Sequence, residues 1–328
     1  MPKEIDFPEP EIAVVIDPDH ANGSLAEITG IDRKVPIVRD LAVALPYRPA
    51  VAVVGLAPSG GALPDPVRRD ALAALQAGLS LASGLHRQLG EDPDFQAACQ
   101  AGQWIWDLRR EPPSVQVGQA RASALHCKRV LAVGTDMAVG KMSACLALQA
   151  AAERRNLLCR FVGTGQAGIL ISGRGVPLDA VRVDYAAGAV EAAVLEAGSG
   201  LSERDLLVVE GQGSLCHPGS SATLPLMRGS QPTALLMVHR AGQSTIGRLP
   251  EVPLPPLKEC ISLCESLAAI ARPRGEGPSP KVLALALNTA ELSAEEAQRC
   301  IHSCQDELGL LCDDPIRNRA DGLLKAFC

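Results

Sequence analysis

Apolar and polar residues alternate in blocks along this chain, as they do where buried strands are followed by helices. In the first part, apolar runs predict strands at 11–17, 50–56, 78–86 and 104–106, with helices at 66–77 and 94–101. The later part predicts strands at 130–133, 159–162, 205–209, 233–240 and 281–287, with helices at 143–155, 189–197 and 257–271 and one that begins near Ser293. Strands that alternate with helices indicate parallel sheets in an α/β fold.

The division into domains follows from length and from one polar segment. A chain of 328 residues fits two domains better than one. The segment 109–127, which contains Pro112 and Pro113, is typical of a linker. We therefore predict a doubly wound N-terminal domain with its linker at 1–127 and a second α/β domain at 128–328.

Composition narrows the possible partners. The net charge of −6, the absence of a dense Lys/Arg tract and only eight aromatic residues argue against nucleic acid as the main partner. The first residues include no apolar signal region, and no apolar run approaches the roughly 20 residues that a membrane helix needs. We expect a cytoplasmic protein with no membrane contact.

The strongest motif is a glycine-bounded turn between the strand 130–133 and the helix 143–155. Such a turn, with Lys141 at the mouth of the helix, is typical of a P-loop, in which backbone N–H groups and the lysine hold phosphates. Five residues, not the usual four, separate its glycines, and Met142 occupies the place where a hydroxyl normally ligates Mg²⁺, with Ser143 one position later. The alternative is a plain turn whose lysine faces solvent. The predicted phosphate-binding residues are Gly134, Thr135, Asp136, Ala138, Val139, Gly140, Lys141, Met142 and Ser143.

A second motif follows the strand 205–209, which delivers Glu210 to the carboxyl edge of the sheet, where ligands bind in such folds. Glu210 is predicted to serve as a metal ligand or general base, and the alternative is a structural ion pair with Lys141. His217, seven residues later, is a base or a hydrogen-bonding loop residue.

Further polar residues lie at other predicted strand ends and loops. The glycine-dense stretch 163–175 is predicted to be a loop that presents Gln166, Ser172 and Arg174 to a ligand. Arg240 ends one strand, and Asn288 ends another, where it would contact a purine ring or cap the next helix. Asp184 is a catalytic acid or a helix cap. In the first domain, the residues Ser59, Gly60, Gly61, Ser83 and His86 are turn residues or ligands.

Eleven cysteines are scattered through the chain. The pairs Cys260/Cys264 and Cys300/Cys304 are spaced to share helix faces and could together bind zinc, but no tight Cys-x-x-Cys turn is present. The alternative, small buried apolar side chains, fits a reducing compartment. We predict no metal site.

Together the motifs resemble a known family. Gly134-Thr-Asp-x-x-Val-Gly-Lys141, Val209-Glu210-Gly211 and Asn288-Thr289 are similar to the P-loop group that includes dethiobiotin synthetase. Gly163-Thr-Gly-Gln-x-Gly168 and Glu210-Gly-Gln-Gly-Ser214 resemble the D-glutamate N-acetyltransferase family more closely, over nearly the whole chain. That resemblance implies a Rossmann-like N-terminal domain, a P-loop NTPase-like C-terminal domain, and transfer of an acetyl group from acetyl-CoA to the amino group of D-glutamate or a related amino acid.

The implied reaction gives roles to the candidate residues. The P-loop and Asn288 would hold the CoA phosphates and nucleotide, and Lys141 would be part of the catalytic site. Glu210, and His217 as second choice, would take a proton from the acceptor amine. Backbone N–H groups of 211–214 would stabilise the oxyanion. The predicted substrate-binding residues are Gln166, Ser172, Arg174, Gln212, Ser214 and Arg240.

Two other functions stay open at this point. One is an ATP- and Mg²⁺-dependent ligase or kinase-like enzyme of the dethiobiotin synthetase type, in which Lys141 stabilises a transferred phosphoryl group. The other is a nucleotide-sensing protein without turnover. The expected partner is a small-molecule amino-acid substrate, and we expect a homo-oligomeric assembly.

Overall fold

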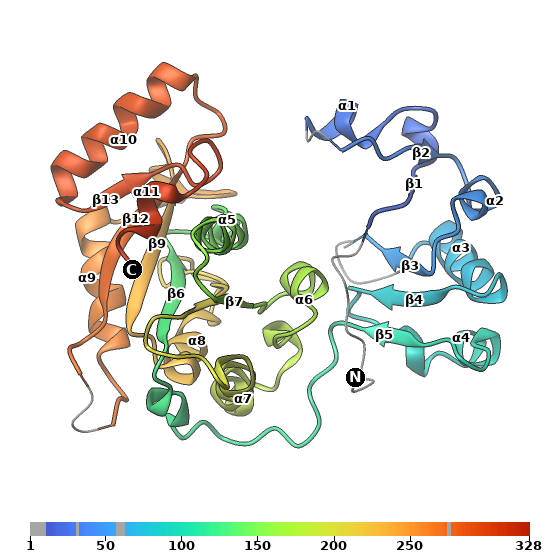
Figure 1. Ribbon diagram of the computed structural model, residues 1–328, viewed down its shortest axis with the longest axis horizontal. Helices are drawn as coiled ribbons and strands as arrows, with labels where there is room; N and C mark the ends of the chain where they lie inside the picture. Colours follow the sequence, from blue (N-terminus) through green and yellow to red (C-terminus); the bar gives the residue numbers. More distant parts are fainter. Residues whose placement is uncertain (1–10, 31–32, 57–62, 274–276) are drawn as a thin grey trace. The chain divides into compact units, whose positions relative to one another are not determined.

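The computed structural model describes residues 11–30, 33–56, 63–273 and 277–328. The chain separates into two compact units, Met1–Arg110 and Glu111–Cys328 (Figure 1). The sequence assigned the segment 109–127 to the first domain as a linker, but residues 111–127 belong to the second unit. The reason is a set of contacts with a helix of that unit, where Gly188 lies against the backbone of Gln116 and of Gly118.

The first unit is an α/β domain with a three-stranded parallel sheet, as the alternating pattern predicted. Its strands are β3 (Val51–Val54), β4 (Ser80–Ser83) and β5 (Ile105–Asp107), joined by α3 (Asp65–Gln76) and α4 (Pro93–Ala98). Leu75, Leu81 and Phe95 pack in its core, each with no exposed surface. Phe95 thereby attaches α4 to the sheet.

The earliest predicted strand is shorter than expected and does not join that sheet. Among the described residues, β1 (Val15–Ile16) pairs only with β2 (Ile37–Val38), next to the short helices α1 (Leu25–Thr29) and α2 (Leu41–Ala44). Of the proposed loop ligands, Ser59, Gly60 and Gly61 lie outside the described residues. The Ser83 hydroxyl accepts a hydrogen bond from the Leu85 N–H at 3.3 Å, which is the behaviour of a turn residue.

The second unit contains a six-stranded sheet, all parallel, in the order β13-β12-β9-β6-β8-β7 (Figure 1). Its strands are β6 (Lys128–Gly134), β7 (Cys159–Val162), β8 (Leu206–Val209), β9 (Ala234–Arg240), β12 (Lys281–Asn288) and β13 (Leu311–Asp313). Chain order reverses around β6, which lies between β8 and β9. Ligands bind at such reversal points, at the carboxyl ends of the strands.

Helices cover both faces of this sheet, so β6 is buried on both sides. Val130 and Ala132 pack with α5 (Lys141–Arg154) and α11 (Asp321–Leu324). Leu131 and Val133 point the other way and pack with the core formed by the remaining long helices. Those helices are α7 (Ala186–Gly198), α8 (Thr223–Ser230), α9 (Leu257–Ala268) and α10 (Ala294–Leu308).

Some elements of this unit were not predicted. The stretch 163–175, expected to be a loop, contains the helix α6 (Gln166–Ser172). Gly173 ends α6 in the left-handed conformation (φ 68°) and donates to the Ile169 carbonyl oxygen, while Ile169 itself is buried, so packing and a C-terminal glycine outweigh the low helix propensity of this segment. The hairpin β10 (Thr245–Ile246) and β11 (Leu249–Pro253), with β13, α8 and α11, were likewise not predicted.

Candidate functional site

A turn of the expected kind connects β6 to α5. β6 ends at Gly134, and α5 begins at Lys141 after Gly140, whose φ of 106° is left-handed. Ala138 in the same turn also has a left-handed φ of 54°. In the described part of the chain, no side chain caps the first N–H groups of α5, so these groups can bind an anion. The geometry therefore fits a phosphate-binding loop.

Lys141 is folded into this loop. Its side chain is buried, and Nζ donates to the Asp136 carbonyl oxygen at 2.8 Å, so the alternative of a solvent-facing lysine is wrong. Burial lowers the pKa of Lys141 to about 8, against the opposing effect of the Asp136 carboxylate. An anion in the turn would compensate for this desolvation.

Asp136 holds the loop to the segment that precedes β11. Its Oδ1 accepts from the Met137 N–H at 2.6 Å, and its Oδ2 accepts from Gln243 Nε2 at 2.6 Å and from the Gly247 N–H at 2.7 Å. Thr135 is fixed in a similar way, since its hydroxyl lies 2.9 Å from Nδ1 of His239. Burial lowers the pKa of His239 to about 4, so that ring is neutral at pH 7.

Two side chains from neighbouring strands hold the carbonyl groups of the same turn. Arg240 Nη2 donates to the Ala138 carbonyl oxygen at 3.0 Å, and Asn288 Nδ2 donates to that of Val139 at 3.1 Å. Arg240 and Asn288 are register partners at the ends of β9 and β12. Arg240, predicted to bind substrate, thus lies against the phosphate loop. Asn288 is no helix cap, because Ser293 caps α10.

A small cavity opens beside these two residues. It has a volume of about 80 Å³. It is lined by Arg240, Ala241, Asn288, Thr289, Ala290, Glu291 and Leu292. Arg240 and Asn288 thus link the phosphate turn to a small recess with both polar and apolar walls.

Glu210 is buried at the end of β8, next to the phosphate loop. Its Oε2 accepts from the N–H groups of Thr164, at 2.7 Å, and Gly165, at 3.3 Å, at the start of α6. Burial raises the pKa of Glu210, although these two N–H groups and Lys141 oppose the shift. No ion pair joins Glu210 to Lys141 among the described residues, so the ion-pair alternative is wrong.

Glycines allow the close approach of these groups. A Cβ at Gly211 would lie 2.8 Å from Lys141 Cδ and 2.0 Å from the Ala132 carbonyl oxygen. A Cβ at Gly168 would lie 2.2 Å from Glu210 Oε2. The lysine and the carboxylate are therefore neighbours, separated by backbone that has no room for a side chain.

The loop after Glu210 is more constrained than the sequence suggested. The Ser214 N–H donates to Ser220 Oγ at 3.0 Å, so the expected oxyanion donor at this position is occupied. Ser214 Oγ donates to the Thr135 carbonyl oxygen at 2.8 Å and thereby ties this loop to the phosphate turn. His217 Nδ1 accepts from the Gly219 N–H at 3.0 Å, which uses one ring lone pair within the loop.

Residues around α6 form a less connected group. Ser172 Oγ lies within hydrogen-bond distance of the Gly168 and Arg174 carbonyl oxygens, so it closes the end of α6. Arg174 is exposed, and its guanidinium has no partner among the described residues. Gln166 begins α6, and a Cβ at Gly165 would lie 2.3 Å from Gln212 Nε2, so Gln212 lies beside the first turn of this helix.

Two of the expected loop residues and Asp184 take other positions. Met142 packs partly into the core on the α5 side of the sheet, and Ser143 is exposed. Asp184 is exposed and does not cap α7, whose N-cap is Tyr185 without a side-chain hydrogen bond.

The cysteines do not assemble into a zinc site. In the described part of the chain, no three His, Cys, Asp or Glu side chains are grouped as metal ligands would be. Cys260 instead contacts Cys216, with 3.6 Å between the sulfur atoms, and this contact lowers the pKa of Cys216 to about 7. None of the described helices has the length and apolar character needed to cross a bilayer.

Sequence comparisons agree with this architecture. Residues 18–111 match the family description "Domain of unknown function (DUF1611_N) Rossmann-like domain", and residues 116–324 match "Domain of unknown function (DUF1611_C) P-loop domain". A DUF1611 family protein from Anabaena variabilis has a crystal structure that superposes with a TM-score of 0.89 at 51% identity, over 96% of this chain and 90% of that one.

Two curated relatives carry an activity in their names. A D-glutamate N-acetyltransferase of Tritonibacter scottomollicae is 36% identical over 94% of this chain and 90% of its own length. A second, from a Pseudoalteromonas species, is 32% identical over 84% and 80%. These relatives support an N-acetyltransferase, that is, an acyltransferase enzyme. The chain belongs to the DUF1611 family, whose members pair a Rossmann-like N-terminal domain with a C-terminal P-loop domain.

Proposed function

We propose that this protein transfers the acetyl group of acetyl-CoA to the amino group of D-glutamate. The observation that carries the proposal is the proximity of a phosphate-binding turn and a buried carboxylate: the Lys141 side chain lies against Gly211, the residue after Glu210, and the two charges affect each other's pKa. The names of two relatives, which align with most of this chain, suggest the transferred acetyl group and the acceptor.

The phosphate turn would hold the donor without breaking a phosphate bond. CoA carries phosphates at its nucleotide end, and the N–H groups at the start of α5 with the Lys141 ammonium provide positive charge for them. Met142 stands where a Mg²⁺-ligating hydroxyl is usual, and both Asp136 oxygens are engaged by protein donors. These features favour holding phosphate over transferring it.

Glu210 is the residue best suited to accept the proton of the amine. Its raised pKa makes it a stronger base than an exposed carboxylate, and two N–H groups fix one of its oxygens. The neutral amine attacks the thioester carbon, so a C–N bond forms and Glu210 takes the amine proton. The C–S bond then breaks, and the CoA sulfur leaves with the electron pair and takes up a proton. His217 is second choice, because Nδ1 is engaged within its loop.

The remaining roles divide between the backbone and the α6 region. The N–H groups of 211–213 are candidates to stabilise the thioester oxyanion, because the Ser214 N–H is bound to Ser220. The exposed guanidinium of Arg174, with the amides of Gln166 and Gln212, would bind the acceptor carboxylates. Ser172, Ser214 and Arg240 would contribute indirectly, since each binds a backbone carbonyl oxygen.

Mass spectrometry of reaction products tests this proposal. The protein is incubated with acetyl-CoA and a panel of D- and L-amino acids, and in parallel with ATP and Mg²⁺. Acetylated D-glutamate that disappears in both Lys141→Ala and Glu210→Gln is the expected result. ADP formed with an acid substrate, without any acetylated product, would overturn the proposal and favour a ligase of the dethiobiotin synthetase type.

A further inference from the structure

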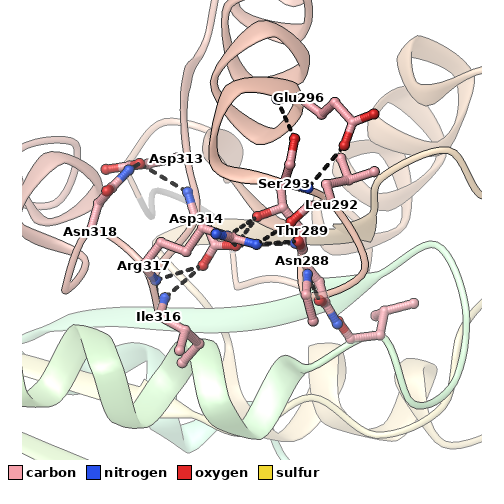
Figure 2. Close-up of polar contacts among 12 residues, drawn as sticks. Asn288, Thr289, Leu292, Ser293, Glu296, Asp313, Asp314, Ile316, Arg317 and Asn318 are labelled. Carbon is pink, nitrogen blue, oxygen red and sulfur yellow. Dashed lines mark hydrogen bonds and ion pairs between the residues drawn. The ribbon is translucent and has the colours of Figure 1, made fainter.

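A buried polar network ties the turn after β12 to the residues that follow β13 (Figure 2). Asp314, 3% exposed, accepts at Oδ2 from the Thr289 N–H at 3.1 Å and from the Thr289 hydroxyl. Its Oδ1 accepts from the N–H groups of Ile316, at 2.8 Å, and Arg317, at 3.0 Å. The carboxylate therefore fixes two separate backbone segments at once.

Arg317 completes the network from the other side. Its Nε donates to Thr289 Oγ1 at 2.9 Å, and its Nη2 donates to the carbonyl oxygens of Thr289, at 3.0 Å, and Leu292, at 2.5 Å. The Thr289 hydroxyl thus accepts from Arg317 and donates to Asp314, which uses its one hydrogen and one of its lone pairs. Charge-assisted bonds of this type are about twice as strong as neutral ones.

This network acts on the residue that contacts the phosphate turn. Thr289 directly follows Asn288, whose Nδ2 donates to the Val139 carbonyl oxygen and whose Oδ1 accepts from the Ala290 N–H at 3.1 Å. The same turn supplies most of the wall of the 80 Å³ cavity beside Arg240. Neither Asp314 nor Arg317 borders that cavity, so both can reach a ligand only through the turn.

We propose that Asp314 and Arg317 are positioning residues for the nucleotide end of the acyl donor, which they serve by fixing the turn Asn288–Leu292. The inference rests on the proposed function, since it takes acetyl-CoA as the ligand of the P-loop. The thioester lies at the opposite end of CoA from the nucleotide, so a looser turn weakens donor binding and leaves the acetyl-transfer step itself unchanged.

The test compares two donors in variants of the full-length protein. Asp314→Asn removes the charge at constant size, and Arg317→Met removes the donors while keeping an apolar stem. Acetyl-CoA is the first donor, and S-acetylpantetheine, which has the thioester but no nucleotide, is the second. Arg154→Met is the matched control: Arg154 also bonds C-terminal residues, Arg319 and Asp321, but at the far end of α5, about 20 Å from Lys141.

We expect Asp314→Asn and Arg317→Met to raise KM for acetyl-CoA about tenfold, as the loss of one charged hydrogen bond implies, with kcat within about threefold of wild type. Their kcat/KM for S-acetylpantetheine should equal that of wild type, and Arg154→Met should behave as wild type with both donors. An unchanged KM for acetyl-CoA would overturn the inference. So would an equal loss with both donors, which indicates general damage to the fold.

Calorimetric titration with CoA separates failure of the inference from failure of the proposed function. If the wild-type protein binds CoA but acetylates nothing, the proposed function fails. Weaker CoA binding in Asp314→Asn and Arg317→Met, but not in Arg154→Met, would then still support the positioning role. Equal CoA affinity in all four proteins would overturn it.

Discussion

The ammonium group of Lys141 donates to the carbonyl oxygen of Asp136, 2.8 Å away within the same turn. The lysine is thus held by its own loop, in a buried position that lowers its pKa to about 8. A phosphate bound in this turn would favour the protonated form and raise the pKa again. Ligand binding and proton uptake are therefore coupled at this side chain.

This coupling predicts that acetyl-CoA affinity falls as pH rises through about 8, because the free protein then loses the Lys141 proton that the complex retains. At pH 8.5, binding should take up roughly three quarters of a proton, a value that follows from a free pKa near 8. Phosphate monoesters titrate near pH 6, so they contribute little to the proton uptake at pH 8.5. Calorimetry in buffers of different ionisation enthalpy measures the uptake. The Lys141→Met variant should bind acetyl-CoA more weakly and take up no proton on binding. Proton uptake that persists in this variant would show that another group binds the proton.

Replacing Glu210 by Gln should lower kcat by roughly 10²- to 10⁴-fold, the usual contribution of a general base, while acetyl-CoA affinity stays near the wild-type value. Burial raises the pKa of Glu210, so the wild-type kcat/KM should decline on the acid side at a pH above the ordinary range of a glutamate. That decline should vanish in the variant. Steady-state kinetics from pH 5 to 8 measure both effects. Glu153→Gln, an exposed glutamate near the end of α5, serves as control, and an identical acid limb in Glu210→Gln would disprove the assignment.

Gly168→Ala should impair the enzyme although it leaves every proposed catalytic side chain in place. The added Cβ would lie 2.2 Å from Glu210 Oε2, so the carboxylate must shift away from the N–H groups of Thr164 and Gly165. We expect kcat to drop about 100-fold, because a small displacement of a reacting group has effects of this size.

Gly229, on helix α8, provides a control that separates the general effect of overpacking from a specific effect on Glu210. At Gly229 an added Cβ would lie 2.3 Å from the Ala187 carbonyl oxygen, between α8 and α7. Gly229→Ala should lower Tm by a few degrees, as overpacking of about 1–3 kcal/mol implies, and retain kcat below that temperature. Equal activity losses in the two variants, measured together with Tm, would mean that Gly168 matters only for stability.

The parts of the site that the sequence could predict are those encoded locally. A buried strand, a glycine-bounded turn and a helix that begins at Lys141 are adjacent in the chain, and so are the β8 strand and Glu210. Their position at one edge of the sheet follows from the parallel arrangement alone. The contact of Asn288 with the turn was not foreseen, but its location at the end of β12 was.

The parts that could not be predicted depend on contacts between distant segments. Thr289 and Asp314 are 25 residues apart, and Gln243 and Asp136 are 107 apart, so neither pairing has a local sequence signal. The strand β13, which carries Asp314 to its place, has three residues, too few for periodicity to identify it. Side-chain partners such as Ser220 for the Ser214 N–H are likewise set by the folded loop.

The segment 111–125, part of the stretch 109–127 that was expected to be a linker, provides a test of stability. Glu191 on α7 has no exposed surface and accepts from the Gln119 N–H at 3.0 Å, the Arg121 N–H at 2.6 Å and Arg121 Nε at 2.7 Å. Glu191→Ala should therefore cost about 3–5 kcal/mol of unfolding free energy, because it leaves an arginine and two N–H groups without their acceptor. Arg121→Ala should cost less, about 1–3 kcal/mol, because it leaves one oxygen of the buried carboxylate without its donor while the two backbone bonds remain. Urea unfolding measures both values. Limited proteolysis of the Glu191→Ala variant should cut first within 111–125. Equal losses of unfolding free energy in Glu191→Ala and Arg121→Ala would show that the ion pair, not the backbone attachment, holds this segment to α7.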